Sequence, residues 1–265
     1  MARGARQSGV AADRSARGEA RGANQPGVTA DQRMARGADL PMRGVAQPAA
    51  ADVRGLPQLH ISGHPLIAHK LSLLRRADTS SHQFSELVAE LSLLLGYEAM
   101  ADLRLQALDV TTPLEETAGS ALSEEVGLVP ILRAGLGMVG SFRQLLPRAQ
   151  VWHLGLYRNE RTLRPVEYYN RLPERATVQA CLVLDPMLAT GGSAIGAVDI
   201  LKGWGAGRIK YVGLIASPYG VKQVAERHPD VAMHVAALDR ELDERGYILP
   251  GLGDAGDRQF GTSLA

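Results

Sequence analysis

The organising feature of the chain is one stretch, Ala180-Cys-Leu-Val-Leu-Asp185-Pro-Met-Leu-Ala-Thr190-Gly-Gly-Ser193 and the residues that follow it to position 204. Residues 180–184 are apolar and are closed by Asp-Pro, which predicts a buried strand. Beyond the glycines, apolar residues recur at the spacing of one helical face: Ala197, Ile200, Leu201 and Trp204. The order is therefore strand, acid, glycine turn and helix.

A turn of this kind suits a phosphate monoester. The first N–H groups of a helix lack partners within the helix, the dipole there is positive, and glycines let an anion approach the backbone. Asp185 would lie at the carboxyl end of a buried strand, where open α/β sheets bind ligands and where a carboxylate can reach sugar hydroxyls. Phosphate and ribose at one turn indicate a phosphoribosyl group. The alternative is an ordinary strand-to-helix turn with an Asx-type acid.

The full nonapeptide Asp185-Pro-Met-Leu-Ala-Thr-Gly-Gly-Ser193 resembles the phosphoribosyl-diphosphate (PRPP) loop of the uracil phosphoribosyltransferases. Three further segments resemble that family in the same order: His64-Pro-Leu-Ile-Ala-His-Lys70, Pro130-Ile-Leu-Arg-Ala-Gly135, and the glycine-rich run from Gly246 to Arg258. The second acid that usually precedes this loop in the wider phosphoribosyltransferase class is Pro186 here, which is typical of the uracil subgroup.

The resemblance implies a set of site residues and a reaction. In this family the PRPP-binding positions correspond here to Arg133, Arg158, Asp185, Pro186, Met187, Leu188, Ala189, Thr190, Gly191, Gly192, Ser193 and Asp254. Of these, Asp185, Arg133 and Arg158 are implied as catalytic, and backbone groups of Ile248, Gly253, Asp254 and Ala255 are implied to face uracil. The expected reaction converts uracil and PRPP to UMP and diphosphate in pyrimidine salvage, with Mg²⁺ carried mainly by PRPP. A homo-oligomer and GTP as an effector are further implications of the family.

Composition is consistent with a globular enzyme and favours no other large class. The chain has 265 residues, is 45% hydrophobic and carries a net charge of +1, so nucleic acid or a membrane surface is not the expected partner. We expect a cytoplasmic protein, because no apolar run reaches the roughly 20 residues of a membrane span and no signal-like h-region is present at the start. The single cysteine, Cys181, is expected to be buried and inert.

Residues 1–55 and 56–265 differ in composition. The first stretch has nine Arg and five acidic residues and almost no large apolar side chains, which predicts a disordered low-complexity tail. In 56–265 we expect helices near 66–74, 84–95, 136–146, 193–203 and 221–227, and strands at 126–132, 151–156, 180–184, 209–216 and 231–237. This alternation predicts one α/β domain, a central mostly parallel sheet flanked by helices, as in the type I phosphoribosyltransferase fold that the resemblance implies.

Some segments give weaker or misleading signals. Residues 105–125 lose periodicity, which predicts a loop or short edge strands. Gly135-Leu-Gly-Met-Val-Gly140 matches the dinucleotide-binding pattern G-x-G-x-x-G, but no acid follows at the expected distance of about 20 residues. We interpret His60, His64 and His69 as surface or structural residues, and the Gly246–Arg258 run as too glycine-rich to form a helix.

Two alternatives to the expected enzyme remain open at this point. One is a regulatory relative that keeps the PRPP loop but uses it to sense nucleotides while binding RNA. A near-neutral charge argues against it, and a basic face would favour it. The other is transfer of the phosphoribosyl group to a different base, against which the Gly246–Arg258 segment argues.

Overall fold

The computed structural model describes residues 46–158 and 165–262, with the backbone alone described at 157–158 and 165–167. The described residues belong to one compact unit, residues 37–265. Its helices are α1 (Ala50–Arg54), α2 (Pro65–Arg75), α3 (Ser81–Ala99), α4 (Leu136–Leu145), α5 (Gly192–Trp204), α6 (Pro218–Arg227) and α7 (Ala255–Phe260). Its strands are β1 (Leu59–Ile61), β2 (Leu105–Thr111), β3 (Glu116–Leu122), β4 (Val126–Pro130), β5 (Gln150–Val151), β6 (Leu154–Arg158), β7 (Pro165–Asn170), β8 (Ala180–Leu184), β9 (Met187–Leu188), β10 (Arg208–Ala216), β11 (Ala232–Leu238), β12 (Glu241–Leu242) and β13 (Ile248–Leu249).

A parallel sheet forms the centre of the described part of the chain. Its strand order is β1-β11-β10-β8-β4-β5, with β9 paired to β10, and every pair is parallel. All five residues of β4 and of β8 are buried, as expected for strands covered on both faces. The predicted α/β class and the mostly parallel sheet are confirmed.

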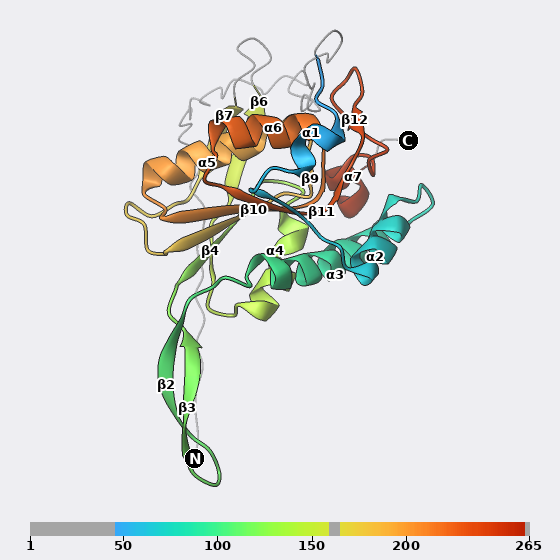
Figure 1. Cartoon of the computed structure of the whole chain (residues 1–265). Helices are drawn as coiled ribbons and strands as arrows, with labels where there is room; N and C mark the ends of the chain where they lie inside the picture. Colours follow the sequence, from blue (N-terminus) through green and yellow to red (C-terminus); the bar gives the residue numbers. More distant parts are fainter. Residues whose placement is uncertain (1–45, 159–164, 263–265) are drawn as a thin grey trace, which may run out of the picture. The chain divides into compact units, whose positions relative to one another are not determined.

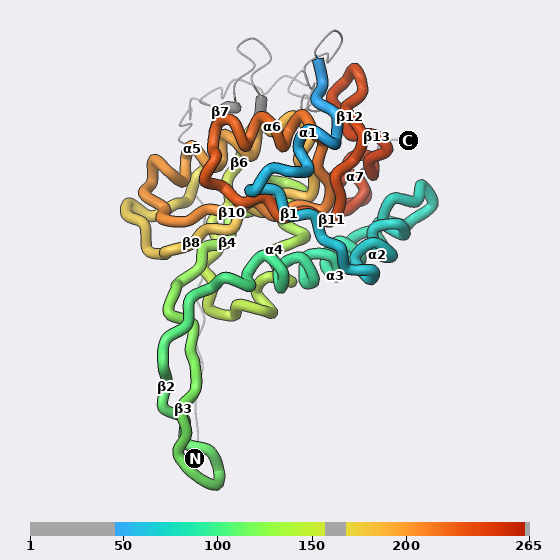
Figure 2. The backbone as a smooth tube through the Cα atoms, viewed as in Figure 1, coloured from blue at the N-terminus to red at the C-terminus, as the bar shows by residue number. Residues whose placement is uncertain are grey.

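Helices cover both faces of the sheet (Figures 1 and 2), and each face has its own core of buried side chains. Helices α2, α3 and α4 pack on one face, where Phe84, Phe142 and Leu128 are completely buried. Helices α5 and α6 pack on the other, with Val198 and Val224 completely buried. The helices that connect successive strands run over the faces of the sheet. The loops that follow the parallel strands therefore lie together at the carboxyl edge of the sheet.

Sequence cues explain the positions at which the helices begin. Ser80 and Ser217 are the N-caps of α3 and α6, accepting hydrogen bonds from the N–H of Gln83 and Gly220. His64 caps α2 in the same way through Nδ1, while His60 stacks on His234 with ring centroids 4.5 Å apart. The interpretation of His60 and His64 as structural residues therefore agrees with their contacts.

Outside the Gly246–Arg258 run, the structure differs from the sequence-based prediction in three places. Residues 50–54 form α1, and Val53 is 2% exposed, so the tail boundary at residue 55 was wrong; residues 1–45 lie outside the described part. Residues 151–156 divide between β5 of the main sheet and β6, which pairs antiparallel with β7. Residues 105–125 form the β2–β3 hairpin, whose strands expose most residues on both faces and so lack the alternation that identifies a strand.

No described helix is both long enough and apolar enough to cross a bilayer. Cys181 is a completely buried free thiol in β8, and burial raises its pKa to about 12, which agrees with the expected inert role.

Candidate active site

The phosphate loop, residues Asp185–Ser193, joins β8 to α5 at the carboxyl edge of the sheet (Figure 1). Gly191 precedes α5 with a φ of 85°, a conformation that favours glycine. The side chain of Ser193 is exposed and that of Thr190 is half-buried, so the start of α5 is accessible from solvent. Its first N–H groups have no partners within the helix and can bind an anion.

The carbonyl groups of this loop are held from behind by β10 and by the turn after it. The Tyr211 hydroxyl donates to the Asp185 carbonyl at 2.8 Å, and the N–H of Leu214 donates to the Pro186 carbonyl at 2.9 Å. Ser217 then donates twice: its N–H to the Leu188 carbonyl at 2.9 Å and its hydroxyl to the Ala189 carbonyl at 2.6 Å. Since the carbonyls are bound to protein, the loop is fixed without using the N–H groups that could hold a phosphate.

Two glycines make this close approach sterically feasible. A Cβ at Gly213 would lie 2.9 Å from the Asp185 carbonyl oxygen, and one at Gly220 would lie 2.3 Å from the Ala189 carbonyl oxygen. Sequence reasoning missed these glycines together with Tyr211 and Ser217. The Ser217-Pro218 pair signals only the start of a helix, and Tyr211 has the pattern of a core aromatic residue.

Asp185 follows the last residue of β8, as predicted. The surrounding protein removes water from its carboxyl and raises its pKa to about 7, although a hydrogen bond from the Met187 backbone acts in the opposite direction. The residue remains half-buried and not fully enclosed. A positive charge or a hydrogen-bond donor on a ligand would favour the ionised carboxylate and so lower this pKa.

The arginine loop, residues Pro130–Gly135, lies directly against the end of β8. The N–H of Ile131 donates to the Leu184 carbonyl at 3.0 Å, and a Cβ at Gly135 would lie 2.3 Å from that same oxygen. The Arg133 side chain is 48% exposed, and its Nη2 lies 3.1 Å from Asp257 Oδ1. The arginine loop thus contacts the end of β8, which directly precedes Asp185, and Arg133 itself contacts α7 through Asp257.

Arg158 is the last residue of β6, and its side chain lies outside the described part of the chain. The backbone of β6 is tied to the arginine loop, because the N–H of Leu132 donates to the Leu154 carbonyl at 3.0 Å. The implied role of Arg158 stays a prediction.

The base segment, residues Ile248–Ala255, runs from β13 to the start of α7. Ile248 and Ala255 are buried, while Gly253 and Asp254 are exposed. Asp254 caps α7, with its Oδ1 accepting from the N–H of Asp257 at 2.8 Å. The prediction that the Gly246–Arg258 run contains no helix was wrong for its last residues, because an Asp cap followed by Ala255 begins α7 despite the glycines upstream.

The base segment and the arginine loop meet through α7. Gln259 donates to the Ala134 carbonyl at 3.3 Å, and a Cβ at Gly256 would lie 3.7 Å from Arg133 Nη2. The structure thus brings together Asp185, Arg133 and Asp254, three of the site residues that the sequence implied.

The misleading glycine pattern at 135–140 has a packing explanation. A Cβ at Gly137 would lie 2.1 Å from the side-chain oxygen of Gln259, so this glycine accommodates α7. The interpretation that these glycines do not form a dinucleotide site is consistent with this contact.

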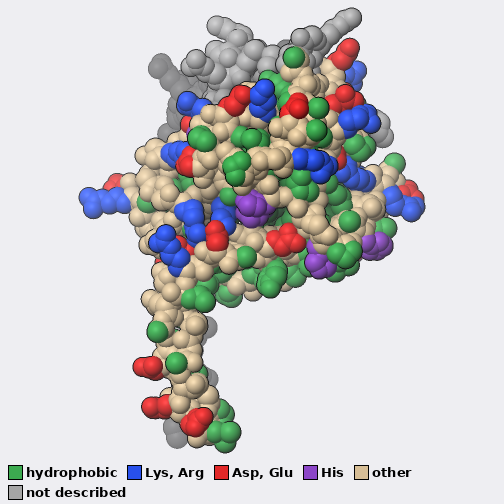
Figure 3. Space-filling model, in the orientation of Figure 1, with side chains coloured by type: hydrophobic (Ala, Val, Ile, Leu, Met, Phe, Trp, Pro, Cys, Tyr) green, Lys and Arg blue, Asp and Glu red, His purple; other side chains and the backbone are tan. Residues whose placement is uncertain are grey.

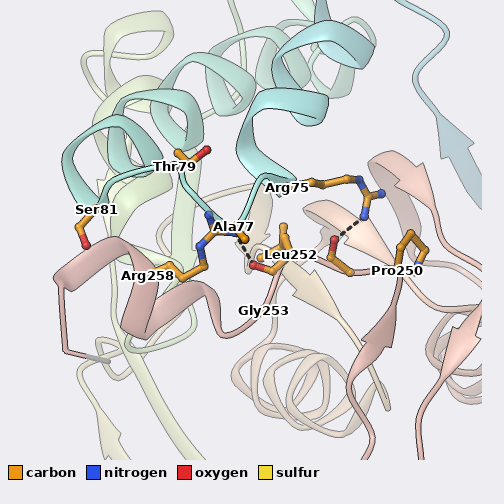
Figure 4. A pocket seen from close by; sticks show the side chains of 9 residues that line it. Arg75, Ala77, Thr79, Ser81, Pro250, Leu252, Gly253 and Arg258 are labelled. Atoms are coloured by element: carbon orange, nitrogen blue, oxygen red, sulfur yellow. Dashed lines mark hydrogen bonds between the residues drawn. The ribbon is translucent and has the colours of Figure 1, made fainter. Parts of the chain in front are cut away.

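A cavity of about 430 Å³ borders the far end of the base segment (Figure 4). It is lined by Arg75, Ala77, Thr79, Ser81, Pro250, Gly251, Leu252, Gly253 and Arg258. Two of these residues hold carbonyls of the base segment: Arg75 donates to the Gly251 carbonyl at 2.6 Å, and Arg258 donates to that of Leu252 at 2.7 Å. Sequence reasoning gave neither arginine a role at the site.

Comparisons with known proteins agree with this geometry. The family model for uracil phosphoribosyltransferase matches residues 61–262. The chain belongs to the uracil phosphoribosyltransferase family. A uracil phosphoribosyltransferase of Roseiflexus castenholzii is 61% identical over 207 residues, which cover 78% of this chain and 100% of that protein. One from Streptococcus uberis is 56% identical over 203 residues, covering 76% and 97%.

A solved structure of the AQ2163 protein from Aquifex aeolicus is also similar, with 39% identity and a TM-score of 0.73, and it covers 78% of this chain and 100% of that one. The match to the family includes the phosphate loop, the arginine loop and the base segment. The alternative of a regulatory, RNA-binding relative finds no support in these matches.

Proposed function

We propose that the protein transfers the phosphoribosyl group of PRPP to N1 of uracil, which yields UMP and diphosphate, and that it serves pyrimidine salvage as a pentosyltransferase. The observation that supports this most strongly is the convergence of the phosphate loop, the arginine loop and the base segment at one edge of the sheet in a member of this family. The three segments offer, side by side, groups suited to the three parts of the two substrates.

In the proposed reaction, uracil N1 attacks ribose C1 as the bond from C1 to diphosphate breaks, through a transition state with oxocarbenium character. The N–H groups of Ala189–Ser193 hold the 5-phosphate, and Asp185 binds the ribose hydroxyls. Arg133 and Arg158 bind the leaving diphosphate, since a guanidinium presents several donors in one plane and does not lose its charge. Most of the rate enhancement comes from orientation and charge stabilisation.

Base selectivity comes from backbone groups in the base segment. Uracil has carbonyl acceptors and an N3–H donor, whereas cytosine reverses this pattern at N3 and at the exocyclic group. Rigid N–H and C=O groups at Ile248 and Gly253–Ala255 would be left unpaired by cytosine, and such mismatches can discriminate by roughly 10⁴-fold. This mechanism requires that the base segment be held firmly in place.

Mg²⁺ is proposed to enter with PRPP. Among the described residues no three His, Cys, Asp or Glu side chains gather as a metal site, and Asp185 and Asp254 are the two carboxylates among the PRPP-binding residues that the family resemblance implies. This donor set fits an ion held chiefly by phosphate and water oxygens, with one carboxylate contact. When bound, the ion would neutralise part of the charge on the departing diphosphate.

A homo-oligomer is also proposed, and the β2–β3 hairpin supports it. Figure 3 shows hydrophobic and acidic side chains along this hairpin. Leu105 is 64% exposed and Leu114 is 94% exposed, which is unfavourable unless another surface covers them. Light scattering on the intact protein and on a Leu105→Ser, Leu114→Ser variant tests this, and a monomeric wild type would contradict it. GTP as an effector and a cytoplasmic location stay predictions of the sequence.

The experiment that tests the proposed function is a product assay with Mg²⁺, PRPP and, in separate reactions, uracil, cytosine, hypoxanthine and orotate. We expect UMP from uracil and no nucleotide from the other three bases. Binding of PRPP without conversion of any base would contradict the enzyme assignment, and a nucleotide formed from another base would contradict the proposed selectivity.

A further inference from the structure

A buried ion pair lies behind the base segment, outside the residues that the family resemblance assigns to either substrate. Arg75 is the last residue of α2, and Asp239 directly follows β11. Arg75 Nη1 lies 2.8 Å from Asp239 Oδ2, and the other arm of the guanidinium contacts Oδ1, so the pair is bidentate. The side chain of Asp239 is only 4% exposed and that of Arg75 is 22% exposed.

Both members of this pair also bind the backbone of one residue of the base segment, Gly251. The N–H of Gly251 donates to Asp239 Oδ2 at 2.9 Å, and the Gly251 carbonyl accepts from Arg75 Nη1 at 2.6 Å. Figure 4 shows the Arg75 side chain extending from α2 toward the stretch between Pro250 and Leu252. Gly251 is thus held at its donor and at its acceptor by two side chains that are separated by 164 positions in the sequence.

Gly251 lies midway between the two parts of the base segment, Ile248 and Gly253–Ala255. Its φ is +65°, and a Cβ there would lie 2.1 Å from the Ile248 carbonyl oxygen, so the turn is tight. A shift of Gly251 therefore changes the spacing between Ile248 and Gly253. In a site that recognises a base by backbone groups, that spacing sets which hydrogen bonds can form.

Stability alone is a weak explanation for this ion pair. Removing a carboxylate from water costs several kcal/mol, and a buried pair often does no better than well-packed apolar residues. The pair instead fixes the orientation of the Gly251 backbone. A charged donor and a charged acceptor bind the same glycine, and each makes a stronger hydrogen bond than a neutral group would. Among the described residues, the side-chain hydrogen bonds of Arg75 and Asp239 go to each other and to Gly251, not to the phosphate loop, although the Asp239 N–H donates to the Ala216 carbonyl beside Ser217 at 2.8 Å.

We propose that Arg75 and Asp239 are positioning residues for the base, which act through Gly251 to hold the backbone groups of the base segment in register for uracil. The inference rests on the proposed function for its kinetic consequence, but the structural consequence does not depend on activity. Neither residue is among those that the family resemblance assigns to uracil or PRPP.

The kinetic test uses Arg75→Lys, which keeps a positive charge but loses the fork that reaches both Asp239 and Gly251, and Asp239→Asn, which keeps an acceptor for the Gly251 N–H. We expect the KM for uracil to rise roughly tenfold or more in each variant, the usual effect of weakening a charged hydrogen bond, with the KM for PRPP within about twofold of wild type. Discrimination against cytosine should fall in both.

A matched control is the neighbouring Arg76→Lys. Arg76 forms a similar bidentate pair with Asp78, but the two side chains are 61% and 67% exposed and their pair does not touch the base segment. Both KM values should stay at the wild-type level. This control separates the loss of an arginine fork at the end of α2 from the loss of the contact with Gly251.

Hydrogen exchange of the ligand-free proteins provides the readout that needs no turnover. Arg75→Lys should exchange the amides of residues 248–255 at least about tenfold faster than wild type, with the amides of 185–193 unchanged. Equal protection of residues 248–255 in the variant and the wild type would overturn the proposal even if the protein made no UMP. With an active enzyme, KM values for uracil and PRPP that rise together, or a fall in melting temperature with both KM values unchanged, would show a merely structural role and would also overturn it.

Discussion

The phosphate loop and the base segment are supported in different ways. Neutral groups hold the phosphate loop: the hydroxyls of Tyr211 and Ser217 and backbone N–H groups of β10 and the turn after it. Charged side chains hold the base segment: Arg75, Asp239 and Arg258. The first support comes from a contiguous stretch, residues 211–217, and the second from Arg75 at the end of α2 together with Asp239 and Arg258, which flank the base segment in the chain.

This difference follows from how each segment leaves the sheet. The phosphate loop follows β8, and β10 is its hydrogen-bonded neighbour, so the pairing of the sheet already supplies most of its contacts. The base segment begins with β13, which pairs with the short strand β12 outside the main sheet. It has no long strand beside it, so side chains that can span a gap and bind carbonyls strongly replace the missing ladder. The two substrates should therefore be separable by mutation.

The largest effect is expected for Asp185→Asn. This variant distinguishes a residue proposed to contact the substrate from the residues that hold the two segments in place. Turnover should fall by about 100-fold or more, because the variant keeps the shape but loses the charge near the developing oxocarbenium centre. The KM for uracil should stay close to wild type. Steady-state rates measure this, and a turnover within about threefold of wild type would remove Asp185 from the chemistry.

Two glycine substitutions each disturb one segment: Gly220→Ala disturbs the phosphate loop, and Gly251→Ala disturbs the base segment. Gly220→Ala would place a Cβ 2.3 Å from the Ala189 carbonyl oxygen, and Gly251→Ala would place one 2.1 Å from that of Ile248. We expect a loss of roughly 10- to 100-fold in kcat/KM for PRPP in the first variant and for uracil in the second, since each strained contact costs about 1–3 kcal/mol.

Gly203→Ala is the control for this pair, because a Cβ there meets nothing within 4 Å. It lies in α5, where alanine is favoured over glycine by about 1 kcal/mol, so the variant should melt slightly higher with unchanged kinetics. If Gly220→Ala and Gly251→Ala affect both substrates equally, the two supports are not independent.

Ser217→Ala sharpens the comparison with a smaller change. It removes the hydroxyl that donates to the Ala189 carbonyl and accepts from the Gly220 N–H. The KM for PRPP should rise roughly tenfold, as two buried backbone groups lose their partner, while the KM for uracil is unaffected. Isothermal titration with PRPP provides an independent check, and unchanged PRPP affinity would exclude Ser217 as a support of the loop.

The smallest effect concerns stability and pH. The folded-state pKa of Asp185, about 7, lies above its ordinary value of 3.8. The unfolded chain therefore loses this proton first as pH rises, so the group lowers the free energy of unfolding progressively between about pH 4 and pH 7 and by a constant amount above that range.

Asp185→Asn removes this dependence in the ligand-free protein. The melting temperature of the variant should be only slightly higher than that of the wild type near pH 4.5 and a few degrees higher above about pH 7.5. The effect is modest because Asp185 is partly exposed. Differential scanning calorimetry across this range is the measurement. A gain that is equal at all pH values would show that the carboxyl of Asp185 is not protonated in the folded protein near neutral pH.

The sequence predicted the substrate-facing segments better than it predicted their supports. Asp185, the glycines at 191–192 and Arg133 have short, recognisable patterns because an anion demands particular residue types at fixed spacing. Arg75 instead looks like a residue that complements the dipole of α2, and Ser217 like an ordinary helix cap. Their second roles depend on which carbonyl the fold brings within reach, and no local pattern contains that information.

The remaining differences have similar causes. The β2–β3 hairpin was not identified as two paired strands because it has no buried face, so its apolar residues do not alternate. Helix α1 was missed because Val53 is its single buried residue and the surrounding sequence is rich in alanine. Helix α7 was missed because the four glycines between 246 and 256 hide a helix whose identifiable signal is Asp254 at its N-cap.

The most direct test of separate supports is a bisubstrate kinetic comparison of wild type, Ser217→Ala, Arg75→Lys and the double variant, with KM values for PRPP and uracil determined in the same preparations. The account predicts a crossed pattern, in which Ser217→Ala raises the KM for PRPP alone, Arg75→Lys raises the KM for uracil alone, and the double variant shows both increases at their single-variant sizes. If each single variant raises both KM values by similar factors, the two segments share one support, and the account is contradicted.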